Sequence, residues 1–235
     1  FILLKSSPYG AWSHIYADQN SFYIQAFGRA LAIQSGFYPH YGHPHHKTWS
    51  WQTRAHNSVL VNGEGQLARV RTSRGKITEF EPGTGQPGSV AYATGDATAA
   101  YHGLLSKFVR HVYHKKPHEF AVVDELAAPE PSRFDWLLHA AEKMEIDEKA
   151  HTVLIRRGDA RLLVEFVSPD NLTFSQTDQF TDDPGNLWEL PEVAYPDQWH
   201  LTVSNTEKLK EVRFEVKMKV WREQSTAGKK QEPTI

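Results

Sequence analysis

The sequence contains no cysteine among its 235 residues, which excludes a disulfide framework and a thiolate metal site. It also has no apolar run near the roughly 20 residues of a membrane-spanning helix, and its first residues do not form a signal peptide. The net charge of −2 lacks the basic excess typical of nucleic-acid-binding domains. The short motifs of serine hydrolases, zinc proteases, P-loop proteins and dinucleotide-binding proteins are absent as well.

What the sequence does contain is a series of short alternating segments separated by Pro- and Gly-rich turns. Segments of this kind, spaced about ten residues apart, predict an all-β fold, an antiparallel β-sandwich of many strands. Two short stretches, Thr98–Lys107 and Glu142–Lys149, are the best helix candidates. The predicted strands include Ser21–Phe27, Ala30–Ile33, Ser58–Val61, Val70–Phe80, Lys107–Tyr113, Glu119–Leu126, Phe134–Ala140, Trp199–Ser204 and Val212–Val220, of which Val70–Phe80 alternates only in part and Phe134–Ala140 less clearly than the others.

The domain organisation follows from the same pattern. We expect one sandwich domain over residues 1–222, and a small C-terminal β subdomain beginning near residue 140 remains an open alternative. Residues 223–235 are polar and predict a frayed tail. Since the chain does not begin with Met, we interpret it as a mature chain or a piece of a longer protein.

Histidines gather between Gly10 and Gln66, where six of the thirteen lie. Imidazole titrates near neutral pH and transfers protons. His14 precedes a predicted strand, has Asp18 and Asn20 close by, and is the candidate catalytic residue. A purely structural role for His14 is the alternative.

A second polar set consists of Asn20, Gln52, Arg54, His56 and Asn57. Arg54 offers a bidentate fork to a carboxylate or sulfate, so we predict substrate binding by Asn20, Gln52, Arg54 and Asn57. The alternative is that these side chains satisfy the backbone of their own loops.

The loop Phe37–Trp51 contains His40, His43, His45 and His46. Composition alone resembles a metal cluster, but metal sites recruit ligands at defined spacing from separate elements. We therefore predict that His45, His46 and Trp49 line a sugar-binding groove. A metal-binding, cupin-like sandwich is the alternative.

Four segments together resemble the C-terminal, β-rich part of the heparinase II/III-like polysaccharide lyases, closest to the branch of oligoalginate lyases and an exo-acting heparin lyase. The segments are SHIYADQNSFYIQAFGRALAIQSGFY, PHHKTWSWQTRAHNSVLVNGEGQ, FVRHVYHKKPHEFAVVDEL and WLLHA. The resemblance covers most of residues 10–140.

This resemblance implies the β portion of an enzyme that cleaves uronic-acid-containing polysaccharides such as alginate or heparin by β-elimination. A helical toroid domain would precede it and supply a Tyr and a His, while His14 matches the catalytic His of the β domain. The isolated chain would then be inactive or nearly so. The resemblance also implies a periplasmic or secreted location.

The resemblance further implies a zinc site in many relatives, with ligands at the positions of Tyr16, Gln34 and His56. Only His56 remains a candidate metal ligand, because Tyr and Gln replace the other two. The alternative to an enzyme is a non-catalytic carbohydrate-binding or scaffold module that uses Trp12, Trp49 and Trp51.

Overall fold

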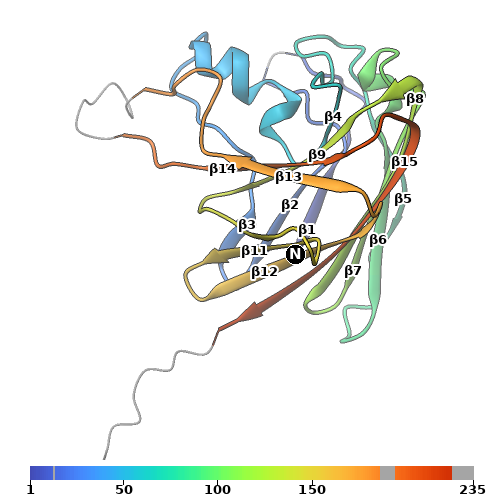
Figure 1. Ribbon diagram of the computed structural model, residues 1–235, viewed down its shortest axis with the longest axis vertical. Coiled ribbons are helices and arrows are strands. Elements are labelled where there is room, and N and C mark those ends of the chain that lie inside the picture. Colours follow the sequence, from blue (N-terminus) through green and yellow to red (C-terminus); the bar gives the residue numbers. More distant parts are fainter. Residues whose placement is uncertain (13, 186–193, 224–235) are drawn as a thin grey trace, which may run out of the picture.

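A computed structural model describes residues 1–12, 14–185 and 194–223 of the chain (Figure 1). The described part is nearly all β, as predicted, and forms three antiparallel sheets. Most of the predicted tail, residues 224–235, lies outside the described residues. Among the described helices, none has the length and apolar character that crossing a membrane requires.

The largest sheet has eight strands in the order β10-β11-β12-β15-β8-β7-β6-β5. Its strands are β5 (Lys76–Glu81), β6 (Val90–Asp96), β7 (Lys107–Lys115), β8 (Glu119–Ser132), β10 (Glu145–Asp147), β11 (Thr152–Arg157), β12 (Ala160–Ser168) and β15 (Leu209–Arg222). Along β15, buried apolar residues alternate with exposed or half-buried ones over much of the strand. This alternation gives the sheet one face toward the core and one toward solvent.

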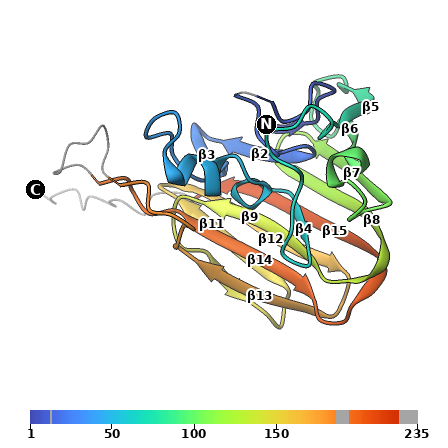
Figure 2. The ribbon, with the colours of Figure 1, turned by 90° about the horizontal axis from the view of Figure 1, so that it is seen from above.

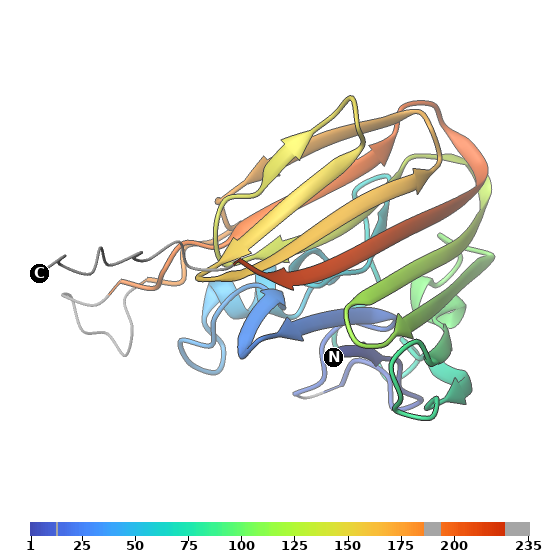
Figure 3. The same cartoon turned by 90° about the horizontal axis from the view of Figure 1, so that it is seen from below.

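Two smaller sheets complete the fold. The four-stranded sheet has the order β13-β14-β9-β4, and the three-stranded sheet has the order β1-β2-β3. Their strands are β1 (Ile2–Lys5), β2 (Ser21–Ala26), β3 (Arg29–Ala32), β4 (Val59–Val61), β9 (Phe134–Ala140), β13 (Leu172–Thr177) and β14 (Trp199–Asn205). Figure 2 shows the four-stranded sheet layered against the eight-stranded one, and Figure 3 shows the blue β2–β3 hairpin below the long strands.

Trp136 joins the three sheets in one core. It lies on β9 and is fully buried, and its ring centroid is 5.6 Å from that of Phe22 on β2 and 5.2 Å from that of Phe166 on β12. Every residue of β9 is buried, as expected for a strand covered on both faces. The apolar contacts of this junction therefore fix the hairpin against the sandwich.

A buried ion pair also fixes the polar segments around the hairpin. Arg110 on β7 makes two 2.6 Å hydrogen bonds to the carboxylate of Asp124 on β8. Its remaining Nη1 donates to the carbonyl oxygens of Asn20 (2.6 Å) and Asn57 (2.7 Å). The Trp136 indole donates to Asp124 (2.8 Å). One guanidinium thus positions the ends of the two segments that carry the candidate site.

In the part of the chain that the structure describes, three short helices interrupt the strands: η1 (His46–Ser50), η2 (Thr53–Ala55) and η3 (Thr98–Tyr101). The third lies inside the predicted helix Thr98–Lys107, whereas the other helix candidate, Glu142–Lys149, contains the edge strand β10 instead. The predicted strand Val70–Phe80 begins only at Lys76, because residues before it form turns. In Figure 1 the light-blue segment with η1 and η2 lies at the upper end of the molecule.

Candidate functional site

The segment that carries His14 is held between two other parts of the chain. On one side, the Ala11 amide donates to the Val70 carbonyl (2.9 Å), and Gly10 lies so close to Arg71 that a Cβ would meet the Arg71 carbonyl oxygen at 2.3 Å. On the other side, the Ala17 amide donates to the Trp51 carbonyl (3.0 Å). His14 itself is exposed, so its ring is available to a ligand.

The side chains around His14 form what we call the rim cluster. Its members are in ring-to-ring or cation-to-ring contact with one another, and they are His14, Tyr16, Tyr38, Tyr41, His46, Trp51 and Arg69. The Tyr41 ring lies 6.2 Å from His14 and 6.3 Å from Trp51, and the guanidinium of Arg69 lies 4.1 Å from the Trp51 ring. Tyr38 and Tyr41 are about half exposed, at 47% and 59%. The rim cluster therefore offers exposed aromatic surface beside a cation.

His46 is the buried member of this cluster. Its ring lies 4.4 Å from that of Tyr38 and 4.5 Å from that of Trp51. Burial, together with the neighbouring His14, His45, Arg69 and His43, lowers the pKa of His46 to about 4. The ring is therefore neutral near pH 7, and neither of its nitrogens has a hydrogen-bond partner among the described residues. A buried polar group without a partner calls for an explanation, and a bound ligand is one.

Tyr16 and His56 lie on the inner side of the cluster, at two positions of the implied zinc site. Their rings stack at 5.6 Å, and burial, then Tyr38 and Asp18, raise the pKa of Tyr16 above its usual range. His56 Nε2 lies 3.1 Å from the Ser50 carbonyl oxygen and must donate to it. Gln34, at the third position, is exposed.

These three positions do not form a typical zinc site, because zinc ligands are Cys, His, Asp and Glu and only His56 is one of these. Within residues 1–12, 14–185 and 194–223, no group of three or more His, Cys, Asp or Glu side chains is placed to hold a metal. Metal binding by His56 stays a prediction.

His45 and Trp49, predicted to line a groove, are buried beneath the stretch that leads to β14. The Phe37 amide donates to His45 Nε2 (3.1 Å), and His45 Nδ1 lies 2.7 Å from the Asp182 carbonyl oxygen. The Trp49 indole donates to Ser35 Oγ (3.1 Å). The polar groups of both rings are thus bonded within the fold, and the structure separates them from exposed His14.

Asn20 and Asn57 are also buried. The Asn57 amide donates to the carbonyls of Phe22 (2.8 Å) and Ile33 (3.0 Å) and accepts from the His139 amide (2.8 Å). Asn20 donates to the Gly95 and Phe108 carbonyls. These bonds give both residues a structural role in joining strands.

Gln52 and Arg54 lie nearer the surface. Gln52 is partly exposed, and its amide donates to the Lys47 carbonyl (2.9 Å). Arg54 is exposed on η2, and its side chain has no hydrogen bond, ion pair or aromatic contact within the described part of the chain. The structure does not link Arg54 to the rim cluster, and substrate binding by Arg54 stays a prediction.

The sequence reasoning missed Arg69 and its neighbour Arg71. Arg71 lies in the predicted strand Val70–Phe80 and Arg69 directly precedes it. The structure forms turns there instead and brings Arg69 over Trp51 and Arg71 over Trp12. The signal available was the basic run RVRTSR, two residues after the NGEGQ turn.

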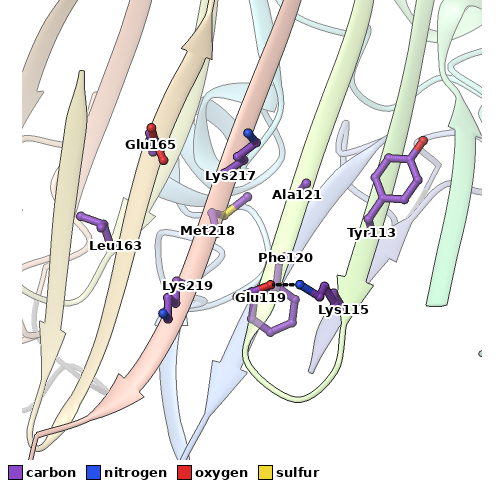
Figure 4. Close-up of a pocket in the computed structure, with 10 residues that line it drawn as sticks. All are labelled: Tyr113, Lys115, Glu119, Phe120, Ala121, Leu163, Glu165, Lys217, Met218 and Lys219. Atoms are coloured by element: carbon purple, nitrogen blue, oxygen red, sulfur yellow. Dashed lines mark ion pairs between the residues drawn. The ribbon is translucent and has the colours of Figure 1, made fainter. Parts of the chain in front are cut away.

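A separate hollow lies on the solvent face of the eight-stranded sheet. Figure 4 shows its lining, which comes from β7, β8, β12 and β15. The volume of the hollow is about 410 Å³. Its charges are mixed: Lys217 and Lys219 lie with Glu165, and Lys115 pairs with Glu119 at 2.9 Å. Three lysines and two glutamates thus line the hollow, which leaves a mixed surface with a small positive excess.

Residues 1–233 match the family model described as heparinase II/III-like, C-terminal. The chain therefore belongs to this family, as its sequence motifs predicted. No curated protein sequence matches the chain.

Among solved structures, the chain is similar to a heparinase III gene product, with a TM-score of 0.75 and 15% identity over 96% of this chain and 33% of that one. It is also similar to the heparan sulfate lyase HepC from Pedobacter heparinus, with a TM-score of 0.73 and 15% identity over 95% and 33% of the two chains. A further heparinase III gives a TM-score of 0.68 at 18% identity, over 92% and 32%. The chain thus spans about one third of the length of these structures and shares the fold of their β portion.

Proposed function

We propose that this chain is the β-sheet portion of a lyase that cleaves uronic-acid-containing polysaccharides by β-elimination, and that His14 takes part in the chemistry. The observation that carries the proposal is the exposed His14 at the edge of an aromatic, cationic cluster. Family membership and the shared fold support it. A helical domain supplied by a longer form of the protein would complete the site, because the structural relatives are three times as long.

The reaction needs three functions at one sugar. The C6 carboxylate must be neutralised so that the C5 proton becomes acidic. A base then removes that proton, the C4–O4 bond breaks as the C4–C5 double bond forms, and an acid protonates the departing O4. Imidazole serves either proton-transfer step near neutral pH. An exposed imidazole can reach a bound sugar, whereas buried His45 and His56 are bonded to the backbone.

The proposed substrate class is an acidic polysaccharide. Heparan sulfate is the substrate named for one structural relative, and the sequence resemblance adds alginate and heparin. We also propose a periplasmic or secreted location, which the resemblance supports and which a fractionation experiment would test.

The test is an assay of the full-length protein on alginate, heparin and heparan sulfate, followed by the ultraviolet absorbance of the unsaturated product. His14→Ala is expected to lower kcat by about 10²–10⁴-fold, the usual contribution of one general acid or base. His118→Ala changes another exposed histidine and is the matched control. Near-normal product formation by the folded His14→Ala protein would refute the role of His14.

A second candidate function, binding of acidic sugars without catalysis, has its own support in the exposed rings of Trp12, Tyr38 and Tyr41. Absence of unsaturated products from every polymer, together with quenching of Trp fluorescence by the same sugars, would favour this candidate over the lyase.

A further inference from the structure

Two arginines of one turn segment lie against two tryptophans beside His14. The guanidinium carbon of Arg69 is 4.1 Å from the Trp51 ring centroid and 5.9 Å from that of Tyr41, and its Nη2 donates to the Tyr41 hydroxyl (3.3 Å). Arg71 lies 5.2 Å from the ring of Trp12, which is 48% exposed. Stacking on an aromatic face restrains a guanidinium and leaves its edge free for hydrogen bonds.

The charge of Arg69 is not neutralised within the described part of the chain. No described carboxylate lies within ion-pair distance of Arg69 or Arg71, and Asp18, the acidic residue next to Tyr16, is paired with Lys5. A guanidinium carries five N–H donors, of which Arg69 uses one on Tyr41. The remaining donors match a carboxylate or sulfate, which accept two parallel hydrogen bonds.

Two more observations support a ligand at this point. His46 is 1% exposed, has two unpartnered ring nitrogens, and lies close enough to Arg69 and His14 to be affected by their charge. The backbone of Arg69 has a φ of +64°, a left-handed conformation that is uncommon for residues other than Gly, Asn and Asp. The fold therefore holds this cation in place at the cost of local strain, a pattern found at ligand-binding positions.

We propose that Arg69, held by Trp51 and Tyr41, is a specificity-determining residue that binds the carboxylate or sulfate of an acidic sugar beside His14. The assignment of the anion to a sugar rests on the proposed function. Arg71 on Trp12 extends the same cationic strip and contacts a neighbouring acidic group. This residue set differs from the one predicted from sequence, in which Arg54 holds the acidic group.

The test compares Arg69→Gln, Arg69→Lys and Arg54→Gln in the 235-residue chain. The probes are an alginate oligosaccharide, which carries only carboxylates, a heparan sulfate oligosaccharide, and a neutral cello-oligosaccharide. Binding is followed by Trp fluorescence and calorimetry at low and high salt, and thermal melting confirms folding. Arg69→Gln is expected to weaken binding of one or both acidic probes about 10–100-fold, the loss of a charge-assisted hydrogen-bond pair, and to reduce its salt dependence.

Arg69→Lys retains the charge but loses the planar fork, and an intermediate loss is expected. Arg54→Gln tests the placement of the acidic group predicted from the sequence, and a smaller loss than in Arg69→Gln is expected. Wild-type affinity in Arg69→Gln, failure of the unchanged chain to bind either acidic probe, or a larger loss in Arg54→Gln overturns the proposal. If Arg69→Gln does not fold, equal affinity of Arg69→Lys and the unchanged chain overturns it too.

The binding assay is independent of turnover. A full-length protein without lyase activity whose binding still depends on Arg69 would refute the proposed function and retain the anion site. An active lyase whose KM and anion binding do not change in Arg69→Gln would refute the anion site alone.

Discussion

Arg110 and Asp124 form a bidentate ion pair that is fully buried between neighbouring strands, with both side chains at 0% exposure. They face one another in the register of β7 and β8. Each also bonds beyond the pair, Arg110 to the carbonyls of Asn20 and Asn57 and Asp124 to Trp136. The pair therefore couples the eight-stranded sheet to both segments of the candidate site.

Asp124→Asn is expected to lower the free energy of unfolding by about 3–5 kcal/mol, because it leaves a buried guanidinium without its counter-charge. Denaturant unfolding measures the loss. Glu215→Gln is the control, since its partner Arg213 is half exposed and exposed pairs contribute about 1 kcal/mol or less. Equal stabilities of the two variants would contradict a structural role for the buried pair.

Because of His139 and His200, we expect the protein to lose stability in mild acid. They face each other on β9 and β14 with their Nδ1 atoms 3.2 Å apart. Burial, then His200 and His56, lowers the pKa of His139 well below 6.5, and burial lowers the pKa of His200 to about 4. The unfolded chain therefore takes up protons below pH 6.5 while the folded chain does not.

The contribution of these two histidines to the free energy of unfolding is therefore complete above pH 6.5. It is lost as the pH falls toward 4, by about 3 kcal/mol for His200 alone. Denaturant midpoints measured across this range check the prediction. His200→Gln is expected to flatten the profile, and His118→Gln, which changes an exposed ring, is expected to leave it unchanged. A profile that is equally steep in all three proteins would show that other groups control it.

Gly10 tests whether the close contact with Arg71 positions His14. Gly10 and Gly28 both have positive φ, +75° and +73°, but only at Gly10 would a Cβ meet another atom, the Arg71 carbonyl oxygen at 2.3 Å. Gly28→Ala is expected to cost about 1–2 kcal/mol from backbone strain alone.

Gly10→Ala is expected to cost more than Gly28→Ala and also to lower the activity of the full-length protein, because it separates the His14 segment from Arg71. Stability and kcat/KM of the two variants give the comparison. Matched losses in both variants would mean that the contact has no effect beyond the backbone conformation.

The strands could be predicted from local sequence because burial of one sheet face makes apolar and polar residues alternate with a period of two. The predicted strand Phe134–Ala140 is β9 residue for residue, and the hairpin strands differ from prediction by one or two residues at their ends. The prediction of Val70–Phe80 was wrong over its first half, where the residues before Lys76 form turns that follow Arg69 and its positive φ.

The sequence alone determined the all-β class, the family, and His14 as the residue to examine, because short motifs and alternation are local properties. Tertiary structure decided which polar side chains stay available. His45 and Asn57 are bonded to partners 137 and 82 residues away, and Arg69 reaches Trp51 only through a turn. Such contacts depend on how the sheets pack against one another. That packing is determined by residues far apart in the sequence, and no local pattern encodes it.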